Sequence, residues 1–271
     1  MTRFWNNTKT ALLLGAMFGL ILLIGSYWGT GGVIIAFLLG GIGNLIAFFF
    51  SDKIAIAAMR GQEVDEQSAP DLVHMVRQLA NNAGLPMPRV YICPQQAPNA
   101  FATGRNPQHA AVAVTQGALR LLTYEEMEGV MAHELAHVKN RDTLISTVAA
   151  TIAGALNALV WVFLFMPIGG SDSRGGNPLV MLLMVILAPI AAAMIQMAIS
   201  RSREYVADAD GARIAGSPNG LIAALQKLES ANERIPMAHE APTQNHMFIV
   251  QPLSATGGGL SKLFSTHPST A

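Results

Sequence analysis

Two histidines four residues apart, His133 and His137, are the clearest sign of chemistry in this sequence. On an α-helix, residues four apart lie on one face, so both imidazoles can reach one ion. Zinc binds neutral imidazole nitrogen, and a catalytic zinc site needs three protein ligands and a water. Glu134 follows the first histidine and can take a proton from that water. The pattern predicts a hydrolytic zinc site, whereas the plainer interpretation is two surface histidines beside a salt-bridging glutamate.

A third ligand must come from elsewhere in the chain. Glu204 and Asp208 are four residues apart and share a helix face, so Glu204 can complete a His₂Glu site while Asp208 hydrogen-bonds to a ligating histidine. By spacing alone, a solvated face on which Glu204 pairs with Arg201 is an equal alternative. His267 and Glu240 are the next ligands to consider, and His267 is expected near the active-site cleft.

Capping and periodicity predict the elements that carry these residues. Thr123 starts a helix with Glu126 three residues later, in the capping-box position, and this helix runs through the two histidines to about residue 138. Apolar residues at helical spacing predict a second, amphipathic helix, which Gly84 ends. That helix and two short strands of a small sheet are predicted at residues 71–83, 89–93 and 110–115.

The distribution of charge predicts membrane spans. Hydrophobic residues make up 51% of the 271-residue chain and charged residues 13%, against about 25% charged residues in soluble domains. Charged residues are absent from residues 10–51, 143–171 and 175–200. A spanning helix needs about 20 apolar residues, so the first stretch holds two spans if the glycines of residues 29–32 form a turn. The four predicted spans lie at residues 11–28, 33–50, 144–167 and 178–199.

Lysine and arginine predict the orientation of these spans. Four spans place sixteen of the seventeen basic residues on one side, and only Arg174 falls on the other. Because basic segments stay in the cytoplasm, both termini and the polar segments should be cytoplasmic. A signal peptide is the alternative for the first span, but no small-residue cleavage site precedes the second apolar run. The predicted organisation is two span hairpins, each followed by a polar segment, at residues 1–51, 52–142, 143–200 and 201–271.

Overall composition excludes several classes of function. Seventeen Lys and Arg balance seventeen Asp and Glu, so the chain has no basic footprint for nucleic acid. A single cysteine, Cys93, excludes an intramolecular disulfide framework and a multi-cysteine metal cluster. The expected partners are therefore the lipid bilayer and a polypeptide substrate, and nothing in the sequence indicates the oligomeric state.

Several motifs together resemble one family, the HtpX-type membrane-bound zinc metalloproteases, which are relatives of the CAAX prenyl proteases. The resemblance covers nearly the whole chain and is specific because it combines the zinc motif with other segments. These motifs are Asn99-Ala100-Phe101-Ala102-Thr103-Gly104, His133-Glu134-Leu135-Ala136-His137, Ser202-Arg203-Glu204-Tyr205-Val206-Ala207-Asp208 and Ser265-Thr266-His267-Pro268. Family sequences usually continue past the last motif into a basic helix, whereas this sequence stops at Ala271.

The resemblance implies a mainly α fold with four transmembrane helices and a cytoplasmic, gluzincin-like α+β domain that carries a small β-sheet. It implies one zinc ion per chain, with Glu204 as the third ligand and Glu134 as the catalytic base. A strand containing Asn99, Ala100 and Phe101 would bind extended substrate by edge pairing. The implied role is cleavage of misfolded or damaged membrane proteins, as part of a stress response, at the cytoplasmic face of a bacterial inner membrane.

Two other classes of function compete with a zinc endopeptidase. A metal transporter or sensor would use the histidines as a binding site, but it would favour ionisable residues inside the spans, and the predicted spans contain none. A proteolytically inactive scaffold that binds membrane proteins is the third class. An acid–base residue beside the first histidine is required only by the peptidase, and Glu134 supplies it.

Overall fold

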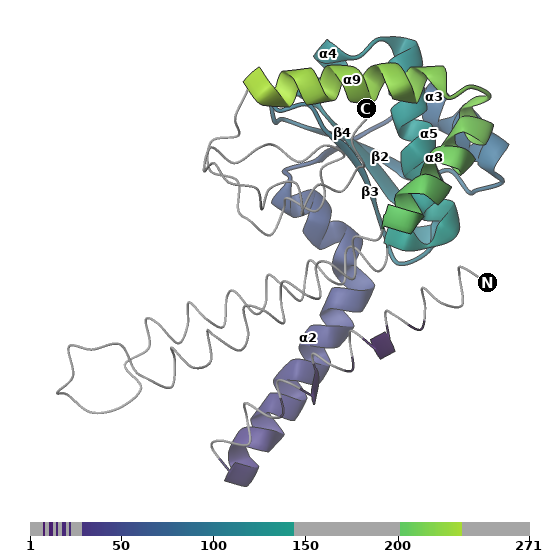
Figure 1. Ribbon diagram of the computed structural model, residues 1–271. Helices are drawn as coiled ribbons and strands as arrows, with labels where there is room; N and C mark the ends of the chain where they lie inside the picture. Colours follow the sequence, from purple (N-terminus) through teal and green to yellow (C-terminus); the bar gives the residue numbers. More distant parts are fainter. Residues whose placement is uncertain are drawn as a thin grey trace.

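A computed structural model describes residues 29–143 and 201–234, together with isolated positions between residues 8 and 22 (Figure 1). The two long described segments form a small mixed sheet and the helices around it. In chain order the elements are α2 (Gly29–Ala58), β1 (Gln62–Val64), α3 (Pro70–Ala83), β2 (Arg89–Cys93), β3 (Ala100–Thr103), η1 (Pro107–His109), β4 (Ala111–Thr115), α4 (Gln116–Leu121), α5 (Tyr124–Asn140), α8 (Arg201–Ala215) and α9 (Asn219–Arg234).

The sheet has the strand order β1-β2-β4-β3. The two strands expected from the sequence, β2 and β4, lie parallel in its centre, and β1 and β3 pair antiparallel at its edges. Side chains of successive strand residues point to opposite faces. In β4, Val112 and Val114 therefore join one buried cluster, and Ala111 and Ala113 join another. Among the described residues, β3 pairs with no strand other than β4 and leaves its second edge open.

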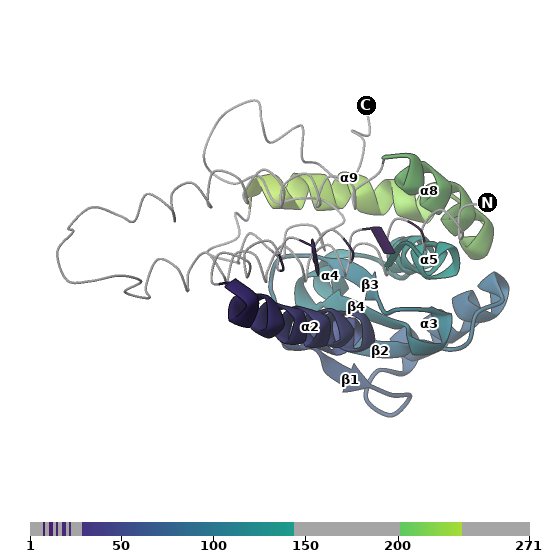
Figure 2. The same ribbon diagram turned by 90° about the horizontal axis from the view of Figure 1, so that it is seen from below.

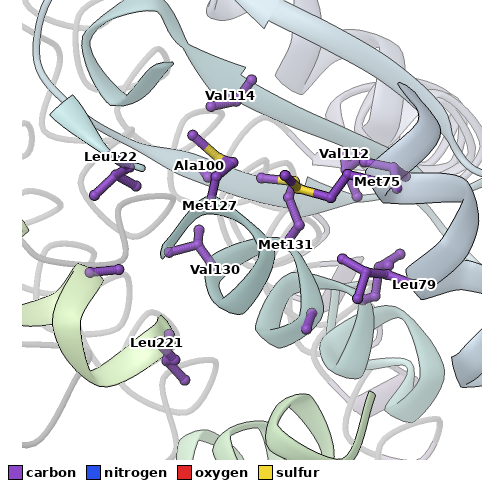
Figure 3. Close-up of a cluster of buried hydrophobic side chains, with 14 of the residues drawn as sticks. Met75, Leu79, Ala100, Val112, Val114, Leu122, Met127, Val130, Met131 and Leu221 are labelled. Atoms are coloured by element: carbon purple, nitrogen blue, oxygen red, sulfur yellow. The ribbon is translucent and has the colours of Figure 1, made fainter. Parts of the chain in front are cut away.

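The larger core lies between the sheet and the helices α3, α5, α8 and α9. Met127 and Met131 of α5 face the valines of β4, with Leu79 of α3 and Leu221 of α9 at the sides (Figure 3). Viewed from below, α8 and α9 lie on the opposite side of α5 from the sheet (Figure 2). Residues from both polar segments thus share one core, and α5 is its central element.

The other face of the sheet packs on the end of α2. Ile56 and Met59 lie against Phe101 and Cys93, and Cys93 is fully buried, which raises its pKa to about 11. An ion pair between the buried Asp52 and the partly exposed Arg89 joins the same helix to β2. Rotation of α2 on the sheet is therefore restricted by both packing and charge.

The start of α5 is built as the sequence predicts. Thr123 accepts a hydrogen bond from the Glu126 N–H, and the Glu126 carboxylate accepts one from the Thr123 N–H at 2.8 Å, which confirms the capping box. Glu126 also binds the Lys227 ammonium of α9 at 2.8 Å. Beside it, a Cβ atom on Gly129 would lie 2.3 Å from the Leu221 nitrogen, so only glycine permits this crossing of α5 and α9.

Residues 29–32 differ from the sequence-based expectation. They form the first turn of α2 and not a turn between two spans. Glycine costs only about 1 kcal/mol relative to alanine in a helix interior, and the apolar run that follows favours continuation as helix. The same helix extends to Ala58 and so crosses the predicted boundary between residues 51 and 52.

The predicted spans remain predictions. By the joint criterion of length and apolarity, no helix within the described part of the chain qualifies as a membrane span. The spans predicted at residues 144–167 and 178–199 lie outside the described residues, as does most of the span predicted at 11–28.

Candidate metal centre

Helix α5 brings the two predicted histidine ligands together. His133 and His137 project from one face of this helix, and their Nε2 atoms lie 3.1 Å apart with the rings nearly perpendicular. His133 is buried, and His137 is slightly more exposed. Two nitrogens at this separation on nearly perpendicular rings can share one metal ion.

Helix α8 supplies the third group, Glu204. Its Oε2 atom lies 3.5 Å from His133 Nε2 and 3.7 Å from His137 Nε2, and the three residues form a group that could hold a metal ion. Tetrahedral zinc with bonds of about 2.0–2.2 Å places its ligand atoms about 3.3–3.6 Å apart. The observed triangle has sides close to these values, so the donor set fits zinc in type and in spacing.

A backbone contact between α8 and α5 allows Glu204 to reach the histidines. Gly211 faces the His133 backbone, and a Cβ atom at residue 211 would lie 3.0 Å from His133 Cα. Glu204, Asp208 and Gly211 follow helical spacing along α8, so they lie on the face turned to α5. Ala207, also at this contact, is fully buried. Small residues therefore set the short distance between the two helices.

Each histidine also contacts a carboxylate through its second ring nitrogen. Asp208 Oδ1 lies 3.0 Å from His133 Nδ1, which is the position predicted for it from its spacing to Glu204. Asp142 Oδ2 lies 3.3 Å from His137 Nδ1. Sequence reasoning missed Asp142, because it lies beyond the end of α5 and only the path of the chain there brings it back to His137.

Glu134 is held by the edge strand of the sheet. Its Oε2 atom accepts a hydrogen bond of 2.8 Å from the backbone N–H of Ala102 in β3, and only 6% of the residue surface is exposed. Burial raises the pKa of Glu134, partly offset by the neighbouring histidines. A buried carboxylate with a raised pKa next to a possible metal site has the properties of a general base.

When no metal is present, the carboxylates around the histidines stabilise the protonated form of both imidazoles. Burial lowers the pKa of His133, but hydrogen bonds to Asp208 and Glu204 outweigh it and raise the pKa to about 9. Burial also lowers the pKa of His137, but the hydrogen bonds to Asp142 and Glu204 outweigh it and raise the pKa well above 6.5. Burial raises the pKa of Glu204, yet the two histidines hold it below its usual range. The site is therefore built to stabilise positive charge.

The remaining predicted site residues have different positions. Asn99 is buried just before β3, where its backbone N–H donates to Thr115 Oγ1 at 2.8 Å and its carbonyl accepts from the Thr115 N–H at 2.9 Å. Ala100 and Phe101 belong to β3 and are buried. His267 and Glu240 lie outside the described residues, so the structure does not test them as ligands.

Comparison with known proteins gives a consistent result. The model of Peptidase family M48 matches residues 66–271. The "Protease HtpX homolog" of Syntrophotalea carbinolica is 51% identical over 268 residues, covering 97% of this chain and 94% of that protein. The protein of the same name from Burkholderia thailandensis is 51% identical over 271 residues, with 98% and 94% covered. The family resemblance predicted from the motifs is thereby confirmed.

A solved structure has the same fold. The crystal structure of S. mikatae Ste24p matches with a TM-score of 0.51 at 18% identity, over 98% of this chain and 64% of Ste24p. This chain thus spans less than two thirds of the length of Ste24p. At that identity the match concerns the fold alone, and it agrees with a mainly helical protein that carries a small mixed sheet.

A larger side chain on α8 at its contact with α5 should weaken metal binding without removing a ligand. In Gly211→Val the new side chain meets the His133 backbone, and such overpacking costs about 1–3 kcal/mol of stability. We expect weaker zinc binding by chelator competition, since Glu204 moves away from both histidines. Ala209→Val, on the exposed side of α8, is the control. Equal zinc affinity in Gly211→Val and the wild type would contradict the proposed role of this contact.

The affinity of the site for zinc should rise with pH between about 6.5 and 9. The folded-state pKa of His133, about 9, exceeds its unfolded value of about 6.5. The resulting stability of the metal-free protein is fully present below about pH 6.5 and is lost as the pH rises through 9. Zinc must displace these protons, so affinity should increase about tenfold per pH unit for each proton released. Chelator competition and thermal unfolding across this range measure both trends, and an affinity independent of pH would refute the assignment.

Proposed function

The chain belongs to peptidase family M48, and on this basis we propose that it is a zinc endopeptidase that cleaves misfolded or damaged membrane proteins at the cytoplasmic face of a bacterial inner membrane. The observation that carries the proposal is that three metal-binding groups converge beside a buried glutamate, Glu134, which is not one of those three groups. His133, His137 and Glu204 would hold one zinc ion. When bound, zinc lowers the pKa of a coordinated water and polarises a peptide carbonyl.

Glu134 is the proton carrier of the proposed reaction. The Ala102 N–H holds its Oε2 atom, which leaves Oε1 to accept a proton from the attacking water. Because burial raises the pKa of this carboxyl, the proton is retained long enough to pass to the nitrogen of the departing amine. The peptide carbon gains the water oxygen, the C–N bond breaks, and the proton on Glu134 completes the new amino group.

The open edge of β3 supports binding of an extended peptide. The backbone groups of Asn99 point to Thr115, and alternation along the strand then directs those of Ala100 and Ala102 to the open edge. The hydrogen bond from Ala102 to Glu134 follows that direction and occupies the Ala102 N–H, so an added strand would pair through the backbone groups of Ala100 and the Ala102 carbonyl. An extended substrate can add to such an edge through main-chain hydrogen bonds, which hold a peptide largely independently of its sequence. This suits substrates recognised by damage rather than by a motif.

Two observations support a location at a membrane. The chain contains three long stretches without charged residues, and helix α2 exposes large apolar side chains along its length. These are Ile34, Phe37, Leu38, Ile42, Ile46, Phe49, Phe50 and Ile54. Soluble proteins rarely expose apolar surface of this extent. Arg105, in the loop after β3, donates a hydrogen bond of 2.8 Å to the Phe49 carbonyl. This loop is therefore joined to the apolar helix.

The position of Glu134 favours catalysis over metal transport or storage. Burial of a carboxylate is costly, and a site that only binds metal gains nothing from a fourth acidic group held away from the ligands by a backbone amide. A scaffold without activity would likewise not require it. The peptidase is the function that uses every group of the site.

Glu134→Gln should abolish cleavage while zinc remains bound. Glutamine keeps the size and can still contact the site, but it cannot take a proton from water. Peptidase activity on a membrane-protein substrate and zinc content should be measured on the same sample, with and without chelator. Glu128→Gln, the same substitution on the same helix, should retain activity. Normal turnover by Glu134→Gln would exclude the proposed mechanism.

The active site should face the cytoplasm. In a Cys93→Ser background, a cysteine introduced at Lys139 should resist an impermeant thiol reagent in intact cells and react in inverted membranes. A cysteine at Ser173 should show the reverse, because sixteen of seventeen basic residues lie on the side predicted to be cytoplasmic. Labelling of both positions from outside the cell would disprove the four-span arrangement.

A further inference from the structure

We propose that Asp142 is a positioning residue of the metal centre, whose carboxylate holds the His137 imidazole in place. The inference rests on the proposed metal centre at His133, His137 and Glu204. It assigns a function to the segment that follows α5. Neither the spacing of the zinc motif nor the proposed reaction requires this segment.

The chain reverses direction at the end of α5 to bring Asp142 to the site. Arg141 adopts a left-handed conformation with φ 60°, and its N–H bonds to the carbonyls of His137 and Val138. A non-glycine residue in this region is uncommon and needs support from its surroundings. Its effect is to fold the next residue back along the last turn of α5, where Asp142 Oδ2 lies 3.3 Å from His137 Nδ1.

The next residue fixes this reversal to the edge of the sheet. Thr143 Oγ1 donates a hydrogen bond of 3.1 Å to the Gly104 carbonyl. Gly104 itself is constrained, because its φ is 124° and a Cβ atom there would lie 2.3 Å from the His109 carbonyl oxygen. The segment after α5 is therefore attached to the loop after β3. Asp142, only 4% exposed, is enclosed between these contacts and His137.

Arg203 places a buried positive charge directly beside Glu204 on α8, since only 6% of its surface is exposed. A carboxylate removed from water needs a nearby positive charge or strong hydrogen bonds.

The chemical effect is on the orientation and tautomer of His137. An imidazole that donates its Nδ1 proton to a carboxylate presents the Nε2 lone pair to the metal, and the acceptor makes that nitrogen a better ligand. His133 is supported in the same way by Asp208, which comes from α8. His137 instead takes its support from the end of its own helix, so its orientation does not depend on the position of α8.

Metal binding by purified full-length protein tests the role of Asp142. Asp142→Asn keeps the shape but removes the charge, and we expect its zinc affinity, measured by chelator competition, to fall about 10–100-fold. In the cobalt-substituted protein its visible absorption bands should shift, since the field of the His137 nitrogen changes. Asp142→Glu should recover part of the affinity. Peptide cleavage should show a lower kcat with an unchanged KM, because Asp142 touches no substrate.

Thr143→Val is the matched control. It removes the hydrogen bond to Gly104 from the same segment but leaves the Asp142 carboxylate, and we expect a smaller loss of metal affinity than in Asp142→Asn. If Thr143→Val loses as much affinity as Asp142→Asn, the loss follows from the path of the segment and not from the charge of Asp142, which overturns the inference. Wild-type affinity and spectrum in Asp142→Asn also overturn it and leave the proposed function intact. If the wild-type protein binds neither zinc nor cobalt, the proposed function itself fails.

Discussion

The close packing of α8 on α5 is the contact on which the site depends. Gly211 allows the backbones to approach at His133. About one turn earlier on α8 Asp208 contacts His133, and about two turns earlier Glu204 contacts both imidazoles. No single element contains the site. Helix α5 carries the two histidines and Glu134, α8 carries Glu204, and the edge strand β3 holds Glu134 in place, so the site depends on the core that joins these elements.

This packing concentrates acidic groups in a small buried volume. Glu134, Glu204, Asp142 and Asp208 all lie within contact distance of the two histidines or of the strand beside them. Such an arrangement is stable only if positive charge accompanies it. Arg203 supplies part of it, and protons on the imidazoles or a divalent metal supply the rest. The affinity for metal is thus a property of the charge balance of the fold as well as of three ligand atoms.

The sequence predicted those parts of the molecule that local rules determine. The capping box of α5, the helix α3 and the strands β2 and β4 follow from residue types a few positions apart. Helical spacing placed His133 and His137 on one face, whereas spacing alone left the role of Glu204 undecided.

Other parts depend on tertiary contacts that residue types do not reveal. The left-handed conformation of Arg141, which brings Asp142 to His137, is unusual for arginine and is imposed by its surroundings. From the sequence alone, Gly211 is a residue that destabilises a helix interior. Its role follows only from its contact with the His133 backbone on α5. Glycines at residues 29–32 suggested a turn, yet the long apolar run after them continues as helix. A strand as short as β3 has too few residues for a pattern of its own, so it was expected only from the family resemblance.

The hydrogen bond between Ala102 and Glu134 joins the strand that we propose binds a peptide to the residue that we propose as the base. The strand that would align a peptide also fixes the carboxylate that moves the proton, so the distance between them cannot vary independently. Outward-facing backbone groups recur along a strand only every second residue, about 6.8 Å. A peptide paired with β3 can therefore move past the base only in steps of two residues, and a shift of one residue turns its hydrogen-bonding groups away. The site of cleavage would then be set by backbone register, and the peptide's side chains would only select among registers that the strand already permits.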